Sequence, residues 1–302
     1  MSVIIGADVG GSKTVVAAEV DGQVHTRVRA AGAALRPDMV LRSATTIADA
    51  IRRSLADTGR ASADVVVVGA AGAGRLEEAK ELARALRAEE LAGTVRVTTD
   101  GEIALVAAFG QSPGILILAG TGSVGLARDP AGTIQSAGGY GWQMGDEGSG
   151  YALGRAALGV VGQAVDGRAE ATVLSERVLT ATRSSDISRL VRWAAAAGQG
   201  EIAGLAPLVL EAAESGDRLA AELVTRAAED LLDIAISLRR LFPKGKAIPV
   251  AIAGGVVQSG PLAAALRTML ASRSDVTPVE DVVDPVLGAL SLARDMVETG
   301  NG

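Results

Sequence analysis

The chain has 302 residues, of which 48% are hydrophobic and 21% charged, and its formal net charge at pH 7 is -6. This is a globular composition with room for about two domains, and the acidic charge argues against nucleic acid or an anionic membrane as partner. Cysteine is absent and His25 is the single histidine, which excludes disulfides, iron–sulfur ligation, histidine metal sites and Ser-His-Asp triads. Any catalysis must then use carboxylates, hydroxyls, Lys or Arg, backbone amides and a hard cation such as Mg²⁺.

The first predicted elements are two strands, 3–7 and 15–20, joined by the glycine-rich turn Asp8-Val9-Gly10-Gly11-Ser12-Lys13-Thr14. Backbone N–H groups in such a turn form a seat for phosphate. A P-loop would need glycine where Ala7 and Ser12 stand, and it would open a helix. Here Asp21-Gly22 follows and predicts a hairpin, so both a P-loop and a Rossmann fingerprint are excluded. His25 falls on the polar face of that hairpin, where we expect a solvated side chain.

Strands and helices then alternate. Apolar residues at helical spacing predict helices over 38–57 and 75–90, and β-branched runs predict strands over 64–69 and 95–99. A short helix over 101–109 follows, and Gln111-Ser112-Pro113-Gly114 marks the domain boundary.

The second half repeats the opening pattern, with strands 115–118 and 124–127 around the turn Ala119-Gly120-Thr121-Gly122-Ser123. A loop over 137–150 holds six glycines, and long loops of this kind are usually functional. Several helices are predicted between 151 and 241, with a polar break among them over 198–204. A strand follows over 248–253, and Gly254-Gly255 precedes a helix to about 271. Asp284-Pro285 predicts the N-cap of a last helix ending near 298. The alternation predicts an α/β fold.

Two aspartates stand where ligands collect in α/β sheets. Asp100 ends a strand before a helix, which suits either a helix cap or a general base that deprotonates an acceptor hydroxyl. Asp8 ends the first strand, where it either holds hydrated Mg²⁺ or shapes the turn. Lys13 either neutralises phosphate or is an exposed hairpin residue.

The long loop offers candidates for substrate binding. Asp146 suits hydrogen bonds to sugar hydroxyls or a simple Gly-Asp turn, and Ser149 is predicted to cap the next helix. Tyr140 and Trp142 either form an apolar platform for a sugar ring or anchor the loop. Trp193, outside the loop, is expected to pack between helices. Gly254-Gly255 with the following helix N-terminus suits the adenosine and α-phosphate end of ATP.

Together these segments resemble the N-acetylglucosamine kinase and BadF/BadG-type ATPase family of the actin-like ATPase and sugar kinase superfamily. The resemblance implies two ribonuclease-H-like domains with ATP in a central cleft. The first would span 1–112, with the helix over 285–300 packed on it, and the second would span 113–284 with a helical insert. The matching segments run in order across nearly the whole chain: Asp8–Thr14, Thr98–Asp100, Ala119–Ser123, Gly138–Ser149, Ala253–Gly255 and Asp284–Ala289.

The resemblance also implies residue roles, with Asp100 as catalytic base and Asp8 beside Mg²⁺. A sugar would lie by Gly139, Tyr140, Gly141 and Asp146. ATP would contact the three glycine turns, through Gly10, Gly11, Ser12, Lys13, Thr14, Gly120, Thr121, Gly122, Ser123, Gly254 and Gly255. The implied protein is a cytoplasmic homodimer that phosphorylates a hydroxyl of an amino sugar such as N-acetylglucosamine, glucosamine or a muramyl sugar. The sequence shows neither an apolar membrane span nor a signal peptide, which agrees with the expected cytoplasmic location.

Two positions depart from the sugar kinase pattern, because Leu35 and Val124 stand where asparagines usually contact sugar hydroxyls. A missing polar contact changes specificity strongly, so the identity of the sugar stays open. Two other classes are considered. A coupling ATPase that drives a partner protein would here lack the cysteines for an iron–sulfur cluster, and a non-catalytic sugar sensor would not need Asp8, Asp100 and both phosphate turns.

Overall fold

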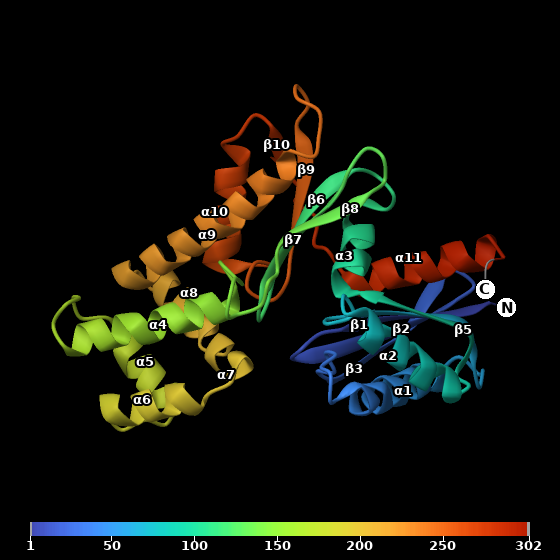
Figure 1. Cartoon of the computed structure of the whole chain (residues 1–302), viewed down its shortest axis with the longest axis horizontal. Helices are drawn as coiled ribbons and strands as arrows, with labels where there is room; N and C mark the ends of the chain where they lie inside the picture. Colours follow the sequence, from blue (N-terminus) through green and yellow to red (C-terminus); the bar gives the residue numbers. More distant parts are fainter. Residues whose placement is uncertain (1, 301–302) are drawn as a thin grey trace. The chain divides into compact units, whose positions relative to one another are not determined.

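The computed structural model describes residues 2–300, which divide into two compact units (Figure 1). Unit 1 comprises the described residues of Met1–Gln111 and Val283–Gly302, and unit 2 comprises Ser112–Val282. The chain therefore passes from one unit to the other twice. Each unit is built on one mixed five-stranded sheet.

Unit 1 has the strand order β3-β2-β1-β4-β5, with β1, β2 and β3 antiparallel and β4 and β5 parallel to β1. Its elements are β1 (Val3–Val9), β2 (Lys13–Val20), β3 (Gln23–Ala31), α1 (Val40–Ala56), β4 (Ala63–Ala70), α2 (Leu76–Ala88), β5 (Ala92–Thr99), α3 (Asp100–Phe109) and α11 (Pro285–Glu298). The hairpin expected after the first glycine turn is confirmed, and His25 is exposed as predicted.

Alternation along the central strands of unit 1 places apolar side chains on both faces of its sheet. On β4, Val66 and Val68 pack with α1 and α2, whereas Val65 and Val67 pack with α3 and α11. The last helix of the chain thus completes the core of the unit that contains the first strand.

Unit 2 has the order β10-β9-β6-β7-β8, which repeats the pattern of unit 1: an antiparallel meander followed by two parallel strands. Its elements are β6 (Gly114–Ala119), β7 (Ser123–Arg128), β8 (Ile134–Gly138), α4 (Gly150–Val165), α5 (Val173–Ala181), α6 (Ile187–Ala196), α7 (Gln199–Ala203), α8 (Ala206–Glu214), α9 (Arg218–Arg239), β9 (Ile248–Ala253), α10 (Gly260–Ala271) and β10 (Val276–Pro278).

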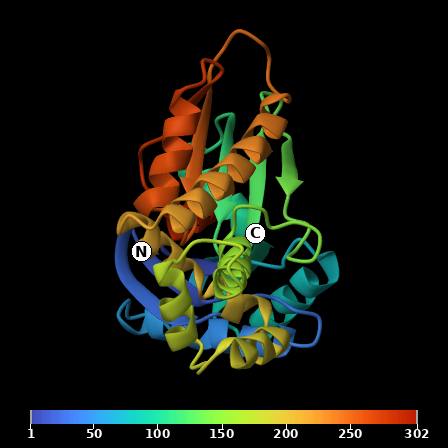
Figure 2. The same cartoon turned by 90° about the vertical axis from the view of Figure 1, so that its left-hand side faces the viewer.

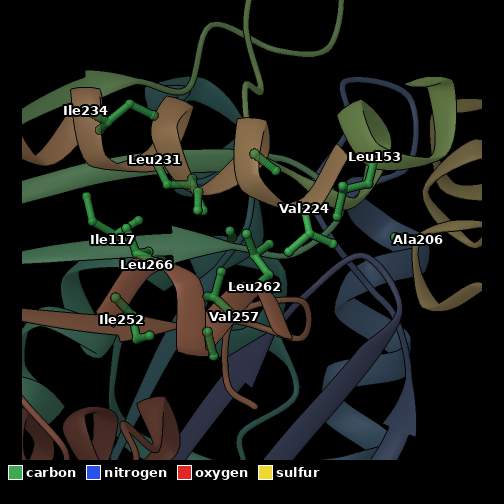
Figure 3. Packing of buried hydrophobic residues seen from close by; sticks show 14 of the residues in the cluster. Ile117, Leu153, Ala206, Val224, Leu231, Ile234, Ile252, Val257, Leu262 and Leu266 are labelled. Atoms are coloured by element: carbon green, nitrogen blue, oxygen red, sulfur yellow. The ribbon is translucent and has the colours of Figure 1, made fainter. Parts of the chain in front are cut away.

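The core of unit 2 lies between its sheet and its helices. Figure 2 shows α9 crossing the sheet, and Gly125 on β7 permits this approach because a Cβ there would lie 2.4 Å from the Ile234 side chain. Figure 3 shows side chains of β6, β9, α9 and α10 meeting in this core, among them Ile117, Ile252, Leu231 and Leu266. Trp193 packs against the same cluster, as expected.

These two mixed sheets with helices confirm the predicted α/β class. The short edge strand β10 has no counterpart in the sequence-based prediction. Asp284 stands at the N-cap position of α11 but makes no side-chain cap hydrogen bond, because its carboxylate pairs with Arg27 at 2.6 Å instead. Within residues 2–300, no helix combines the length and the apolarity that crossing a membrane requires.

Candidate functional site

The first glycine turn lies in unit 1 and is a tight reversal between β1 and β2. The N–H of Gly10 donates to the carbonyl of Lys13 at 2.9 Å, and Gly11, Ser12 and Lys13 are exposed. The loop after β3 lies against this turn, since a Cβ on Gly32 would come within 2.0 Å of the Gly11 carbonyl. The packing of this loop fixes the conformation of the turn, so that exposed backbone amides of the turn can bind a phosphate.

Thr14 is the first residue of β2 to be buried, and it is fully inaccessible to solvent. In the described structure its hydroxyl has no hydrogen-bond partner. A buried hydroxyl without a partner is costly, so this one calls for a group from outside the protein or for water.

Asp8, near the end of β1 and two residues before Gly10, lies in a carboxylate-rich environment. Burial, together with the negative charges of Asp100 and Asp284, raises its pKa to about 6, while Lys13 acts in the opposite direction. The fold thus brings together charged groups from β1, β2, α3 and the start of α11. Excess negative charge at the carboxyl end of β1 favours a bound cation.

Asp100 is the first residue of α3, directly after β5. The cap of this helix is Thr99, whose hydroxyl accepts from the N–H of Glu102 at 3.0 Å, so Asp100 itself does not cap the helix in the expected way. The Asp100 carboxylate accepts from the N–H of Gly101 at 3.0 Å, and burial raises its pKa. Thr99 takes the capping position because its extended backbone places the hydroxyl over the first turn.

Glu102 was not predicted as part of this region. Its carboxylate pairs with Arg96 at 2.7 Å and also accepts a hydrogen bond from the Thr98 hydroxyl. Both partners lie on β5, an edge strand, so Glu102 ties the start of α3, where Asp100 lies, to the strand that precedes it. Thr99 and Glu102 have the spacing of a capping box, but the Glu102 carboxylate binds Arg96 and Thr98 instead, so this sequence signal does not indicate its role.

The second glycine turn lies in unit 2, between β6 and β7, and the N–H of Gly120 donates to the carbonyl of Gly122 at 2.9 Å. Gly254, far away in sequence, lies against the start of this turn at φ 111°; a Cβ there would come within 2.2 Å of the Ala119 carbonyl. The N–H of Val256 donates to the same carbonyl at 3.3 Å. Two segments predicted to bind nucleotide are therefore neighbours in unit 2.

Asp146 is only 5% exposed and has a left-handed backbone, with φ 62°. One carboxylate oxygen accepts from the N–H of Ser123 at 3.3 Å, and the other accepts from Nε2 of Gln199 at 2.9 Å. Burial raises the pKa of Asp146. The carboxylate fits against the second turn because Gly122 has no side chain: a Cβ there would lie 2.7 Å from Oδ1.

The aromatic residues of the loop after β8 do not form one platform. Tyr140 is 71% exposed, whereas the Trp142 ring packs against Tyr151 on α4, with ring centroids 5.4 Å apart. Trp142 thus has the anchoring role considered in the sequence analysis. Ser149 caps α4 as predicted, accepting from the N–H of Ala152 at 3.2 Å.

Leu35 and Val124, which replace the expected asparagines, both make apolar contacts. The Leu35 side chain is 2% exposed and lies in the core of unit 1. The N–H of Leu35 donates to the Ala71 carbonyl at 2.8 Å, which holds the loop between β3 and α1 against the end of β4. The Val124 side chain lies where a Cβ on Gly139 would be, at 2.8 Å. Neither position provides a polar group to a substrate.

The predicted residues thus form two groups, each described within its own unit. Asp8, the first turn and Asp100 belong to unit 1, while the second turn, Gly254-Gly255, the loop with Tyr140 and Asp146, and Gln199 belong to unit 2. Among residues 2–300, no three His, Asp or Glu side chains come close enough to hold a metal ion by themselves. A hydrated cation would need oxygens from a ligand or from water as well.

Two mixed five-stranded sheets of equal topology, each with a glycine turn between its first two strands, define an α/β protein of the class that includes sugar kinases and actin-like ATPases. The model of the BadF/BadG/BcrA/BcrD ATPase family matches residues 5–293, and the chain belongs to this family.

Known proteins similar to the chain agree with this assignment. The chain is 28% identical to the N-acetylmuramic acid/N-acetylglucosamine kinase of Clostridium acetobutylicum over 86% of this chain and 87% of that protein. It is 26% identical to the N-acetyl-D-glucosamine kinase of Dictyostelium discoideum over 96% and 97%. A provisionally assigned N-acetylglucosamine kinase from Chromobacterium violaceum has a similar crystal structure, with TM-score 0.80 and 30% identity over 97% of this chain and 99% of that one.

Proposed function

We propose that this protein is an ATP-dependent kinase that phosphorylates a hydroxyl of an amino sugar. The observation that carries the proposal is the grouping of Asp8 and Asp100 beside a glycine turn, because these groups match the parts that phosphoryl transfer needs. The amino sugar kinases similar to this chain support the substrate class.

Asp100 is the proposed catalytic base. Its burial favours the neutral form, so its ionised form is a stronger base than an exposed aspartate would be. Held by the Gly101 N–H at the start of α3, the carboxylate would accept the proton of the sugar hydroxyl as the oxygen attacks the γ-phosphate.

The glycine turns are the proposed phosphate contacts. Gly11 and Ser12 would offer backbone amides with Lys13 as a neutralising charge, and the unpaired Thr14 hydroxyl would gain a partner. Gly10, whose own N–H donates to the Lys13 carbonyl, would shape the turn around the phosphate. In unit 2, the backbone of Thr121 and Gly122 would bind phosphate oxygens. Gly120 and Ser123, whose N–H groups donate within the turn and to Asp146, would hold the turn in shape beside the phosphate. Gly254 and Gly255 would lie at adenosine. Gly139, Tyr140, Gly141 and Asp146 are the proposed sugar contacts.

The carboxylate of Asp8 fits hydrated Mg²⁺, which prefers oxygen ligands and keeps several waters. Bound Mg²⁺ would neutralise charge on the phosphates. Asp8 would hold the coordinated water in place, and its ionisation would be favoured by the added positive charge. We further propose a cytoplasmic homodimer, and size-exclusion chromatography with light scattering tests the dimer.

The experiment that tests the function is ADP release from Mg-ATP across free sugars, including N-acetylglucosamine, glucosamine, N-acetylmannosamine and N-acetylmuramic acid. We expect saturable turnover with at least one of them. The variant D100N should lose phosphoryl transfer and keep ATP binding. Full activity of D100N would contradict the role of Asp100 as catalytic base. ATP turnover that a partner protein stimulates and no sugar does would contradict the kinase assignment.

A further inference from the structure

Gln199 connects the helical insert of unit 2 to a proposed sugar contact. It is the first residue of α7, and its Nε2 donates to Oδ2 of Asp146 at 2.9 Å. The other oxygen of that carboxylate accepts from the N–H of Ser123 in the second turn at 3.3 Å. Asp146 is therefore held between the phosphate turn and a helix that the sequence places about fifty residues later.

The position of Gln199 is fixed by close backbone packing. A Cβ on Gly154 of α4 would lie 1.9 Å from the Ile202 carbonyl of α7, so the two helices meet where only glycine fits. At the start of α7, the N–H of Gly198 donates to Oε2 of Glu201 at 2.9 Å. These contacts place the Gln199 amide at Asp146 without relying on a free loop.

The chemistry of this pair differs from that of a structural ion pair. A cation beside a buried carboxylate would neutralise its charge. Gln199 instead orients the carboxylate and leaves its charge intact. An ionised carboxylate has about four acceptor positions, of which Ser123 and Gln199 use two, so Asp146 keeps the capacity to accept from a sugar hydroxyl.

We propose that Gln199 is a positioning residue for the acceptor sugar: its hydrogen bond holds the Asp146 carboxylate in the orientation that accepts from a substrate hydroxyl. The helical insert is then part of the acceptor-binding machinery. This inference rests on the proposed function, because it assigns the sugar contact to Asp146.

The test compares Q199A with Q163A, in which an exposed glutamine at the end of α4 is truncated. KM for the acceptor sugar should rise about 10- to 100-fold in Q199A, the range that corresponds to a hydrogen bond with a charged group. KM for ATP should match that of wild type, and Q199A should remain folded although it loses one hydrogen bond to a buried carboxylate. Q163A should leave both KM values and the unfolding midpoint unchanged. Q199M, which keeps the side-chain length without hydrogen-bonding groups, is a second variant should Q199A fold poorly.

A double-mutant cycle adds a readout that a structural role would not produce. If Gln199 acts through Asp146, then Q199A combined with D146N should be no worse for acceptor KM than D146N by itself. Additive effects, or an equal rise of both KM values with a lowered unfolding midpoint, would overturn the positioning role. An unchanged acceptor KM in Q199A, with an active wild type and inactive D100N, overturns this inference only. A wild type that phosphorylates no sugar overturns the proposed function itself.

Discussion

Replacing Asp8 by asparagine should make the protein more stable and less active. The structure raises the pKa of this carboxyl from 3.8 to about 6, mainly by burial and then by the charges of Asp100 and Asp284. The folded protein therefore binds more protons than the unfolded chain between about pH 4 and 6, so stability falls as pH rises through this window and is level above it. Relative to an uncharged side chain, Asp8 therefore lowers the free energy of unfolding by about 3 kcal/mol at pH 7.5 and by about 1.5 kcal/mol at pH 5.

The assay is chemical unfolding of wild type and D8N at pH 5 and pH 7.5, with D38N, an exposed aspartate of the same unit, as the matched control. We expect D8N to be more stable at both values, with an advantage that grows by about 1.5 kcal/mol at the higher pH. D38N should show neither effect. Kinase activity dependent on Mg²⁺ should fall in D8N. A D8N protein no more stable than wild type at pH 7.5 would refute the burial cost assigned to Asp8.

Three further substitutions test contacts at other points of the fold. G254A forces a Cβ toward the Ala119 carbonyl at positive φ, and it should lower stability by about 2 kcal/mol and weaken ATP binding, measured by calorimetry. R239M removes a buried guanidinium that donates to four backbone carbonyls, so the free energy of unfolding should fall by about 3 kcal/mol. The same replacement of the exposed Arg240 should change it little, and equal losses in the two variants would contradict this role of Arg239. G288A should separate α11 from α3, detected as faster proteolysis of unit 1; unchanged digestion would disprove that contact.

Much of the fold could be predicted because its signals are local. Asp21-Gly22 between alternating runs identified the hairpin that excludes a P-loop, and β-branched residues identified the buried strand β4. The same holds for the helix cap at Ser149, whose hydrogen bond lies within one turn. Local patterns are enough to predict an element when the residues that stabilise it are close together in the sequence.

The contacts that sequence reasoning missed join residues that are far apart in the sequence. Nothing near Asp284 indicates that Arg27 takes its carboxylate away from the helix it precedes. In the same way, the sequence predicts a polar break over 198–204, whereas the structure forms the short helix α7 there, and only the packing of α7 against α4 places Gln199 on Asp146. Such pairs depend on the tertiary arrangement of elements, which periodicity does not encode.

The place of α11 in unit 1 has a consequence for how the protein is made. Val65 and Val67 of β4 and Ile103 of α3 are synthesised before unit 2, whereas α11, which packs on the same face, is synthesised after it. At about 5–20 residues per second, all of unit 2 is added during the roughly 10–40 s in which this apolar face is covered by α3 but not by α11. The nascent first half therefore exposes apolar surface of the kind that chaperones bind. A chain that terminates before Pro285 would keep this surface exposed and would be prone to aggregation.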